Sequence, residues 1–162
     1  MAIMTFKNGE EYMLKLSKLA NGTLTKVCGP AIHDAADLVA DAIRAELQNL
    51  PTDERWGTQD TPNIGPRKVQ KRDLLDSLGI ASMQEDEKGM LNVKIGWDGY
   101  NSVKTARWPN GQPNQMVARA IESGTSWMYK NKFVSRGVSK AKKQALAVMK
   151  KRVSEEIDKI MK

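Results

Sequence analysis

The sequence has very few of the residues from which catalytic and metal sites are most often built. It contains one cysteine, Cys28, and one histidine, His33, among 162 residues. A single cysteine excludes an internal disulfide, and one cysteine with one histidine cannot supply the usual nitrogen and sulfur ligands of a zinc site. A catalytic triad would depend entirely on His33, which stands beside the apolar stripe of a predicted helix and is expected to be structural or solvated. We therefore predict that the chain is not an enzyme and has no cofactor and no metal.

Long hydrophobic runs and phosphate-binding loops are missing as well. The apolar runs last only a few residues, which argues against a membrane span. The first residues, MAIMTFKNGEEY, lack the basic-then-apolar order of a secretory signal, so we expect a protein that stays in the cytoplasm of the cell that makes it. Gly124 is isolated, whereas phosphate loops require G-x-x-x-x-G-K-[ST] or G-x-G-x-x-G. We expect Gly124 to close a helix in a left-handed backbone state instead.

The sequence does have an uneven distribution of positive charge. The net charge is +7, from 26 basic and 19 acidic residues, and nine of the basic residues lie between positions 123 and 154 without one acidic residue. The rest of the chain therefore holds 17 basic residues against 19 acidic ones. Such a local positive stretch favours a polyanion or an acidic protein surface as partner. The alternative is a solvated helix face that is cationic only for solubility.

Apolar residues at helical spacing predict three amphipathic helices, over residues 9–21, 32–50 and 138–161. The second is about five turns long, and Pro51 ends it. Its polar face carries Asp34, Asp37 and Asp41, and the last helix carries Lys140, Lys143, Lys150 and Lys151 roughly opposite its apolar side. Three aspartates could gather a hard cation, but without a loop that supplies further oxygens a solvated acidic face is the favoured interpretation.

Between the long helices the pattern changes to that of a small sheet. Residues 91–97 alternate apolar and polar, residues 80–84 are a possible partner strand, and EDEKG between them is typical of a turn. The segment RDLLDSL before them predicts a short helical turn or a strand lead-in. Together these elements predict an antiparallel hairpin.

The remaining segments complete a single predicted domain over residues 1–162. Residues 116–121 suit one or two helical turns that end at Ser123-Gly124. Residues 51–67 and 98–115 are rich in proline, glycine and polar residues, so we expect long, mobile loops there. The predicted fold class is α+β, with a small antiparallel sheet packed against two long amphipathic helices.

In the order of these features and in two short motifs, the chain resembles the minor tail-component proteins of long-tailed bacteriophages, also called neck or tail-completion proteins. A segment of the type TG-x-L-x-x-S-I in that family is similar to RDLLDSL at residues 72–78. A segment (F/I)-E-x-G-T followed by P-F-(L/V) is similar to IESGT at 121–125 and KFV at 132–134. Here lysine replaces the proline, and residues 98–115 resemble an insertion.

The resemblance implies a structural virion protein that is made in the bacterial cytoplasm and assembles, as a ring, at the head-tail junction. Its partners would be copies of itself and neighbouring neck or tail proteins. A ring needs two different complementary surfaces on each subunit. Candidates for the subunit interface are Asp34, Asp37, Asp41, Glu122, Gly124, Thr125, Trp127 and Phe133. Aromatic residues of this kind can anchor a segment on a partner or on the chain's own core.

Two roles are open for the lysines of the last helix. Lys140, Lys143, Lys150 and Lys151 are candidates for contact with DNA in a neck channel or with an acidic partner. They also motivate a different hypothesis, a basic nucleic-acid-binding protein that contacts phosphates through this helix. No motif known to read bases accompanies them.

Overall fold

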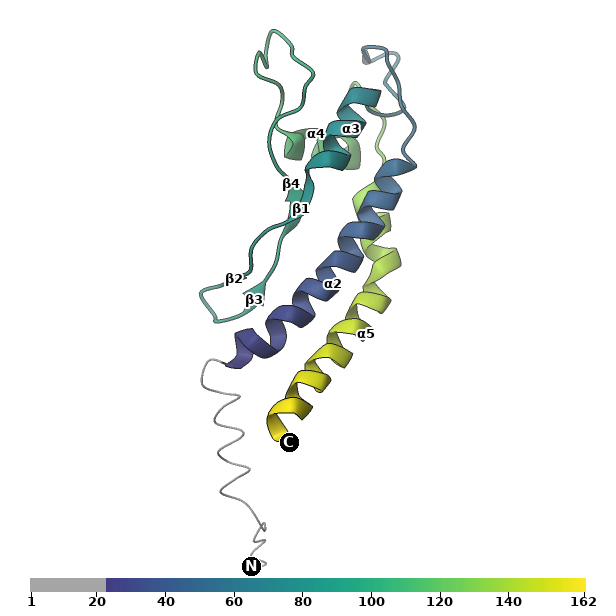
Figure 1. Ribbon diagram of the computed structural model, residues 1–162. Helices are drawn as coiled ribbons and strands as arrows, with labels where there is room; N and C mark the ends of the chain where they lie inside the picture. Colours follow the sequence, from purple (N-terminus) through teal and green to yellow (C-terminus); the bar gives the residue numbers. More distant parts are fainter. Residues whose placement is uncertain (1–22) are drawn as a thin grey trace, which may run out of the picture.

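Two long antiparallel helices form the length of the molecule, and the other elements pack along one side and around one end of this pair (Figure 1). The computed structural model describes residues 23–162, so the helix expected over residues 9–21 lies outside the described residues. The predicted α+β class is confirmed, with helices packed on small antiparallel strand pairs.

The first long helix, α2, spans Thr23–Gln48, and the second, α5, spans Phe133–Met161. Both begin earlier in the chain than their periodicity predicts. In α2 the helix continues through Pro30, which cannot donate a backbone hydrogen bond to the preceding turn. The predicted end of α2 before Pro51 is confirmed.

Small residues dominate the contact between the two long helices. The buried residues of α5 are Phe133, Gly137, Ala141 and Ala145, and α2 buries a series of alanines along the same length of the pair. Short side chains let two helices approach closely, because the distance between helix axes depends on the side chains at the contact. The apolar stripe predicted for the first long helix therefore lies in a close contact with the second.

The predicted hairpin is present, but it is divided into two short antiparallel pieces. Strand β1 (Leu78–Ile80) pairs with β4 (Ile95–Trp97), and β2 (Gln84–Glu85) pairs with β3 (Leu91–Asn92). Three residues, 81–83, separate the pieces on one side and two, 93–94, on the other. One extra residue on one strand is the signature of a β-bulge, so the single strand expected over residues 80–84 was wrong.

Two shorter helices position the ends of this ribbon. Helix α3 (Lys68–Ser77) leads directly into β1, and α4 (Asn114–Ser123) ends where predicted, at Ser123. Residues 51–67 contain no helix, and loop 98–113 ends where α4 begins. Their predicted mobility stays a prediction.

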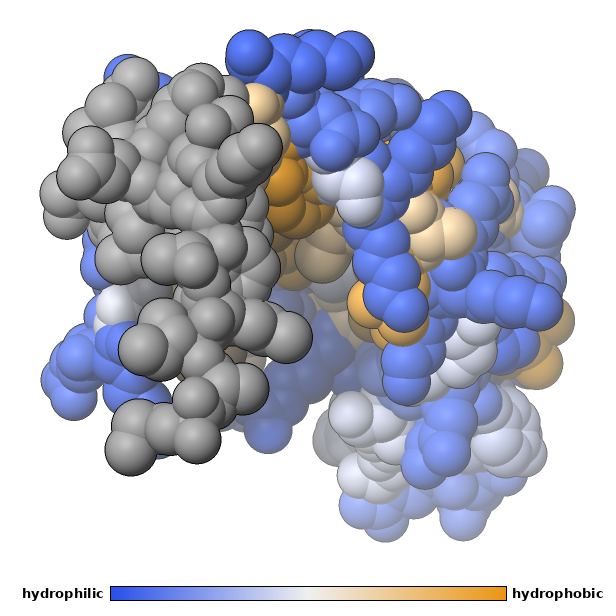
Figure 2. Space-filling model, turned by 90° about the horizontal axis from the view of Figure 1, so that it is seen from below, coloured by the Kyte–Doolittle hydropathy of each residue, from blue (hydrophilic) through white to orange (hydrophobic). Residues whose placement is uncertain are grey.

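The larger core side chains gather at the end of the molecule where α2 finishes and α5 begins. Leu47, Leu74, Ile121 and Phe133 are fully buried there, and the rings of Phe133 and Trp97 meet edge to face with centroids 5.8 Å apart. The surface seen from the opposite end is mainly hydrophilic, with some hydrophobic residues visible among the hydrophilic ones (Figure 2).

Candidate interaction surfaces

The connection between α4 and α5, which contains the IESGT segment, is a tight corner with a defined role for each residue. Ile121 is fully buried, and Gly124 ends α4 with φ of 76° and a backbone hydrogen bond to Ala120. A side chain at Gly124 would meet the backbone of Lys130 at 3.0 Å, and a positive φ is a conformation that glycine adopts without strain. The predicted helix-closing role of Gly124 is confirmed.

Glu122 joins the corner to the start of α5. Its carboxylate accepts hydrogen bonds from the backbone N–H groups of Val134, at 2.8 Å, and Ser135, at 3.2 Å, and from the Ser135 hydroxyl. These N–H groups lie in the first turn of α5, where a helix has no partners of its own and where its dipole favours an anion. Glu122 was predicted at a subunit interface, but its oxygens are engaged within the chain.

Phe133 was also predicted at a subunit interface, and that prediction was wrong. The side chain is fully buried in the core, against Trp97. The helix α5 begins at Phe133 itself, so the residue belongs to the inward face of the first turn. A buried ring offers no surface to another protein.

The loop at residues 51–67 is hydrogen-bonded to this corner through Asn63. Its backbone N–H donates to the carbonyl of Trp127, and its carbonyl accepts from the N–H of Tyr129, both at 2.8 Å. Its side-chain amide donates to the carbonyl of Arg55 at 2.8 Å. Sequence reasoning missed this contact, because nothing in the sequence pairs residue 63 with residue 128.

Within the loop, Asp53 is the anchor. Its carboxylate accepts two hydrogen bonds from the Arg55 guanidinium, at 2.7 and 3.0 Å, and is 8% exposed. The Arg55 guanidinium, followed by backbone N–H groups of Arg55 and Ile64, holds the pKa of Asp53 well below its usual range. Asp53 also accepts a hydrogen bond from the Ile64 N–H at 3.4 Å, so it holds the two sides of the loop together.

The pairing between loop and corner places several apolar side chains on the same outer surface. Asn63 is buried and Met128 packs against the core, so strand alternation turns their neighbours outward. The exposed residues are Ile64, Trp127 and Tyr129, and Trp56 joins them because its neighbour Gly57 lies against the Trp127 carbonyl; the four are 52–63% exposed. We call Trp56, Ile64, Trp127 and Tyr129 the aromatic patch.

Basic residues outnumber acidic ones in the segments that carry the aromatic patch. The Arg67 guanidinium lies 4.2 Å from the centre of the Trp56 ring, within the range of a cation–π interaction. Lys68, Lys130 and Lys132 are exposed in the two segments that carry the patch, residues 51–68 and 125–132. The first segment also has two exposed acidic residues that do not pair with Arg55, Glu54 and Asp60. Thr125, another predicted interface residue, accepts a hydrogen bond from the Trp127 N–H at 3.2 Å and so supports the patch.

The charged faces predicted on the two long helices are partly used inside the chain. Asp34, Asp37 and Asp41 are all exposed on α2, but Asp34 lies 3.6 Å from Arg152 of α5 and Asp41 lies 2.6 Å from Arg44. Among the residues described, no group of acidic, histidine or cysteine side chains is arranged to hold a metal ion. The aspartates therefore form a mainly solvated, partly paired face.

Lys140 takes part in a contact between the two long helices. It donates to Glu46 of α2, together with Arg136 at 2.8 Å, and Glu46 is 7% exposed. The hydrogen bonds from Lys140 and then Arg136 hold the pKa of Glu46 below its usual range. Lys140 was predicted as a contact for DNA or an acidic partner; within the chain it binds Glu46, and its side chain is 69% exposed.

The other lysines of the predicted basic face remain exposed. Lys143, Lys150 and Lys151 are exposed on α5, and within the described residues their one acidic neighbour at 4 Å or less is Glu155, 3.9 Å from Lys151. This pair is too long for a hydrogen bond. The three lysines are therefore an available positive surface within the described part of the molecule.

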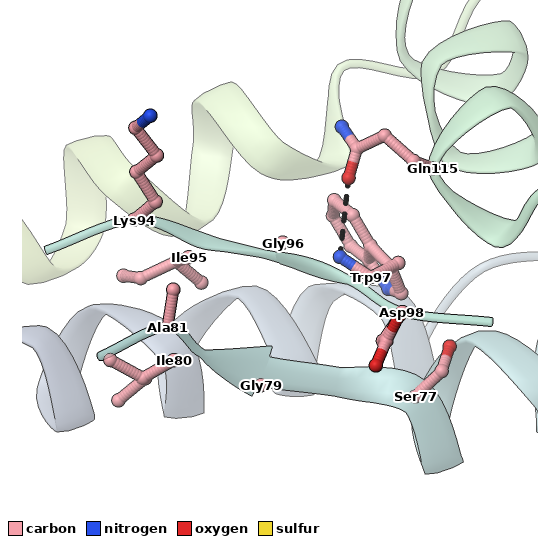
Figure 3. A pocket seen from close by; sticks show the side chains of 10 residues that line it. All are labelled: Ser77, Gly79, Ile80, Ala81, Lys94, Ile95, Gly96, Trp97, Asp98 and Gln115. Carbon is pink, nitrogen blue, oxygen red and sulfur yellow. Dashed lines mark hydrogen bonds between the residues drawn. The ribbon is translucent and has the colours of Figure 1, made fainter.

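A shallow hollow of about 590 Å³ lies over the β1–β4 ribbon (Figure 3). Gly79 and Gly96 face each other across the two strands, and their missing side chains open the hollow. Gln115 of α4 accepts a hydrogen bond from the Trp97 backbone N–H at 3.2 Å. Lys94 extends away from Asp98, which lies toward the other end (Figure 3), so the charged groups do not converge on one point.

Comparison of the chain with protein-family models, with curated proteins and with solved structures finds no match. No helix in residues 23–162 has an apolar stretch long enough to cross a membrane.

Proposed function

We propose that this protein is a structural subunit of the head-tail junction of a long-tailed bacteriophage, and that it assembles there to join the tail to the DNA-filled head. The observation that carries the proposal is the aromatic patch. It is built on the corner whose IESGT segment resembles the tail-completion family, and it exposes two tryptophans and a tyrosine. Tryptophan and tyrosine are enriched where proteins bind one another.

The corner has the construction that a docking surface needs. Ile121 anchors it in the core, Glu122 ties it to α5, and Asn63 ties it to the loop 51–67. Exposed apolar side chains held on a fixed backbone lose less conformational entropy on binding than side chains of a free loop. The resemblance and this surface support the same kind of role.

The test is a deletion of the gene in the phage or prophage that encodes it. We expect lysates with DNA-filled heads and finished tails that remain separate, as seen by electron microscopy, and recovery of complete particles when the chain is supplied in trans. Complete, infectious particles without the chain would contradict the proposal, as would arrest before the heads are filled.

The exposed lysines of α5 support a second candidate, a nucleic-acid-binding protein. Lys143, Lys150 and Lys151 are available for phosphate contact, and such binding weakens steeply as salt rises. The mass of the purified protein in solution, with and without DNA at two salt concentrations, separates the two candidates. Self-association without DNA favours the junction subunit, and a monomer that shifts only with DNA favours the nucleic-acid binder.

A further inference from the structure

The end of the molecule opposite the aromatic patch carries an exposed acidic hairpin tip. We use this name for residues 84–90, QEDEKGM, all of which are exposed. The tip has three acidic residues, one lysine, Lys88, and an apolar residue, Met90, that is 63% exposed. The Asp86 carboxylate accepts the N–H groups of Lys88 and Met90, at 2.9 and 2.8 Å, and so fixes the turn.

The hairpin tip and the aromatic patch lie at opposite ends of α2. Met83, next to the tip, packs beside Gly29 near the start of the helix, and the loop of the patch follows its end at Gln48. At 1.5 Å per residue these points on α2 are roughly 30 Å apart. Figure 1 shows the β2–β3 ribbon and the loop after α2 at the two ends of the long helix.

We propose that the aromatic patch of one copy of this chain receives the hairpin tip of a second copy, so that copies join head to tail. This inference rests on the proposed function and names the contact between subunits. The two surfaces are complementary in charge: the tip has three acidic residues and one lysine, whereas the segments that carry the patch, residues 51–68 and 125–132, have five basic residues and three acidic ones. Met90 supplies an apolar group for the aromatic rings, with which methionine sulfur makes favourable contacts.

The position of the surfaces determines what such a contact builds. A surface that meets a different surface on its neighbour generates a ring or a filament. Since the tip and the patch are far apart, one copy can use both at once. A patch that bound another patch would stop at a dimer.

The size of the patch indicates a weak contact. A whole aromatic side chain offers 150–250 Å² of surface, so the four exposed residues present on the order of 500 Å². A stable interface takes roughly 800 Å² from each partner. We therefore expect association at high concentration, strengthened where a ring closes or a neighbouring neck protein holds the copies together.

The test uses two variants that each remove one side of the contact. The patch variant is Trp127→Ala, and the tip variant is Glu85→Lys with Glu87→Lys. Sedimentation velocity should show the wild type gaining mass with concentration, and each variant alone should need at least about tenfold more protein to do so. Mixed together, the two variants should form a one-to-one dimer that grows no further, because one intact tip meets one intact patch.

Matched controls keep the comparison specific. Tyr100→Ala removes an aromatic side chain that is 66% exposed but lies outside the patch, and Asp76→Lys reverses an exposed charge outside the tip. Both should associate like the wild type. Circular dichroism and thermal unfolding verify folding, and Trp56→Ala replaces Trp127→Ala if the latter is not folded.

Several outcomes would overturn the inference. They are a wild type that stays monomeric throughout, variants that associate normally, and variants that fail to form the dimer when mixed. A short single-stranded oligonucleotide bound by the wild type and the tip variant, but not by the patch variant, would make the patch a nucleic-acid surface.

Rings that form without the patch and the tip would end this inference and leave the proposed function standing. If the head-to-tail contact forms but deletion of the gene leaves particle assembly intact, the inference stands and the proposed function is wrong.

Discussion

Phe133 was predicted at a subunit interface, whereas the structure has it in the core. The ring is fully buried against Trp97 and starts α5. We expect Phe133→Ala to lower the free energy of unfolding by about 3–5 kcal/mol, because it removes buried apolar surface and leaves a cavity. Phe133→Leu keeps most of the volume and should cost about 1–1.5 kcal/mol. Urea unfolding measures both, and an alanine variant as stable as the wild type would show that the ring is not in the core.

The lowered pKa of Glu46 predicts how the free energy of unfolding depends on pH. Lys140 and Arg136 lower its pKa in the folded state, so its contribution is complete above the unfolded value of about 4.3 and is lost as the pH falls through the folded value. We expect the unfolding free energy to fall on acidification below about pH 4. Glu46→Gln should be less stable at neutral pH and should lose less on acidification.

Denaturant unfolding at a series of pH values measures this difference. Asp53, whose pKa is also lowered, will leave a residual acid dependence in both proteins. Glu87→Gln is the control, because Glu87 is exposed and forms no ion pair with another described residue. Equal acid slopes for the wild type and Glu46→Gln would contradict the coupling of Glu46 to the two cations.

At the scale of elements, Gly137 lies at a close approach between the two long helices. A side chain there would come within 2.8 Å of the Cα of Ile43, an atom of the backbone of α2. Alanine favours a helix by about 1 kcal/mol over glycine, but the helices would have to separate, which costs about 1–3 kcal/mol. We expect Gly137→Ala to be destabilising by about 1–2 kcal/mol net.

The matched control for Gly137→Ala is Ser139→Ala, two residues away on the exposed side of the same helix. It should change the unfolding free energy by no more than about 0.5 kcal/mol, in the stabilising direction. Thermal unfolding of both variants tests the sign. A stabilised Gly137→Ala variant would mean that the helix propensity outweighs the contact with α2.

A helix or strand could be predicted where the pattern that indicates it lies within its own stretch of sequence. The periodicity of α2 and α5 and the glycine at the end of α4 are local signals, and the structure has these elements. The starts of the long helices were missed because Pro30 and Gly137 are typical of helix ends, and because the cap of α5 comes from Glu122, eleven positions before the helix begins.

The aromatic patch could be predicted only in part. Trp127 and Tyr129 stand out in the sequence beside the glycine corner, whereas Trp56 and Ile64 belong to a loop with no periodicity. The pairing of Asn63 with Met128 that unites them joins residues far apart in the chain. A single sequence carries no signal for such a pairing, because the hydrogen bonds involve the backbone and not a residue type.

At the scale of the whole molecule, the buried residues of α5 lie in its first half, so we expect its second half to open more easily. The four buried residues of α5 lie between Phe133 and Ala145, and residues 146–161 have none. Amide exchange reflects local opening where few apolar contacts are buried. We expect amides beyond about residue 150 to exchange at least about tenfold faster than those at 137–145, as measured by mass spectrometry. Uniform protection along α5 would contradict this.

The same measurement distinguishes how the molecule associates. Raising the protein concentration should slow exchange in residues 84–90 and in 125–130 together, because both ends of each copy become covered in a head-to-tail array. A patch-to-patch dimer would protect only residues 125–130 and the loop 51–67. DNA binding through the exposed lysines of α5 would instead change exchange near residues 143–151, and only when DNA is added. Protection of the tip and patch that is lost in Trp127→Ala but kept in Tyr100→Ala would connect the two ends through a single contact.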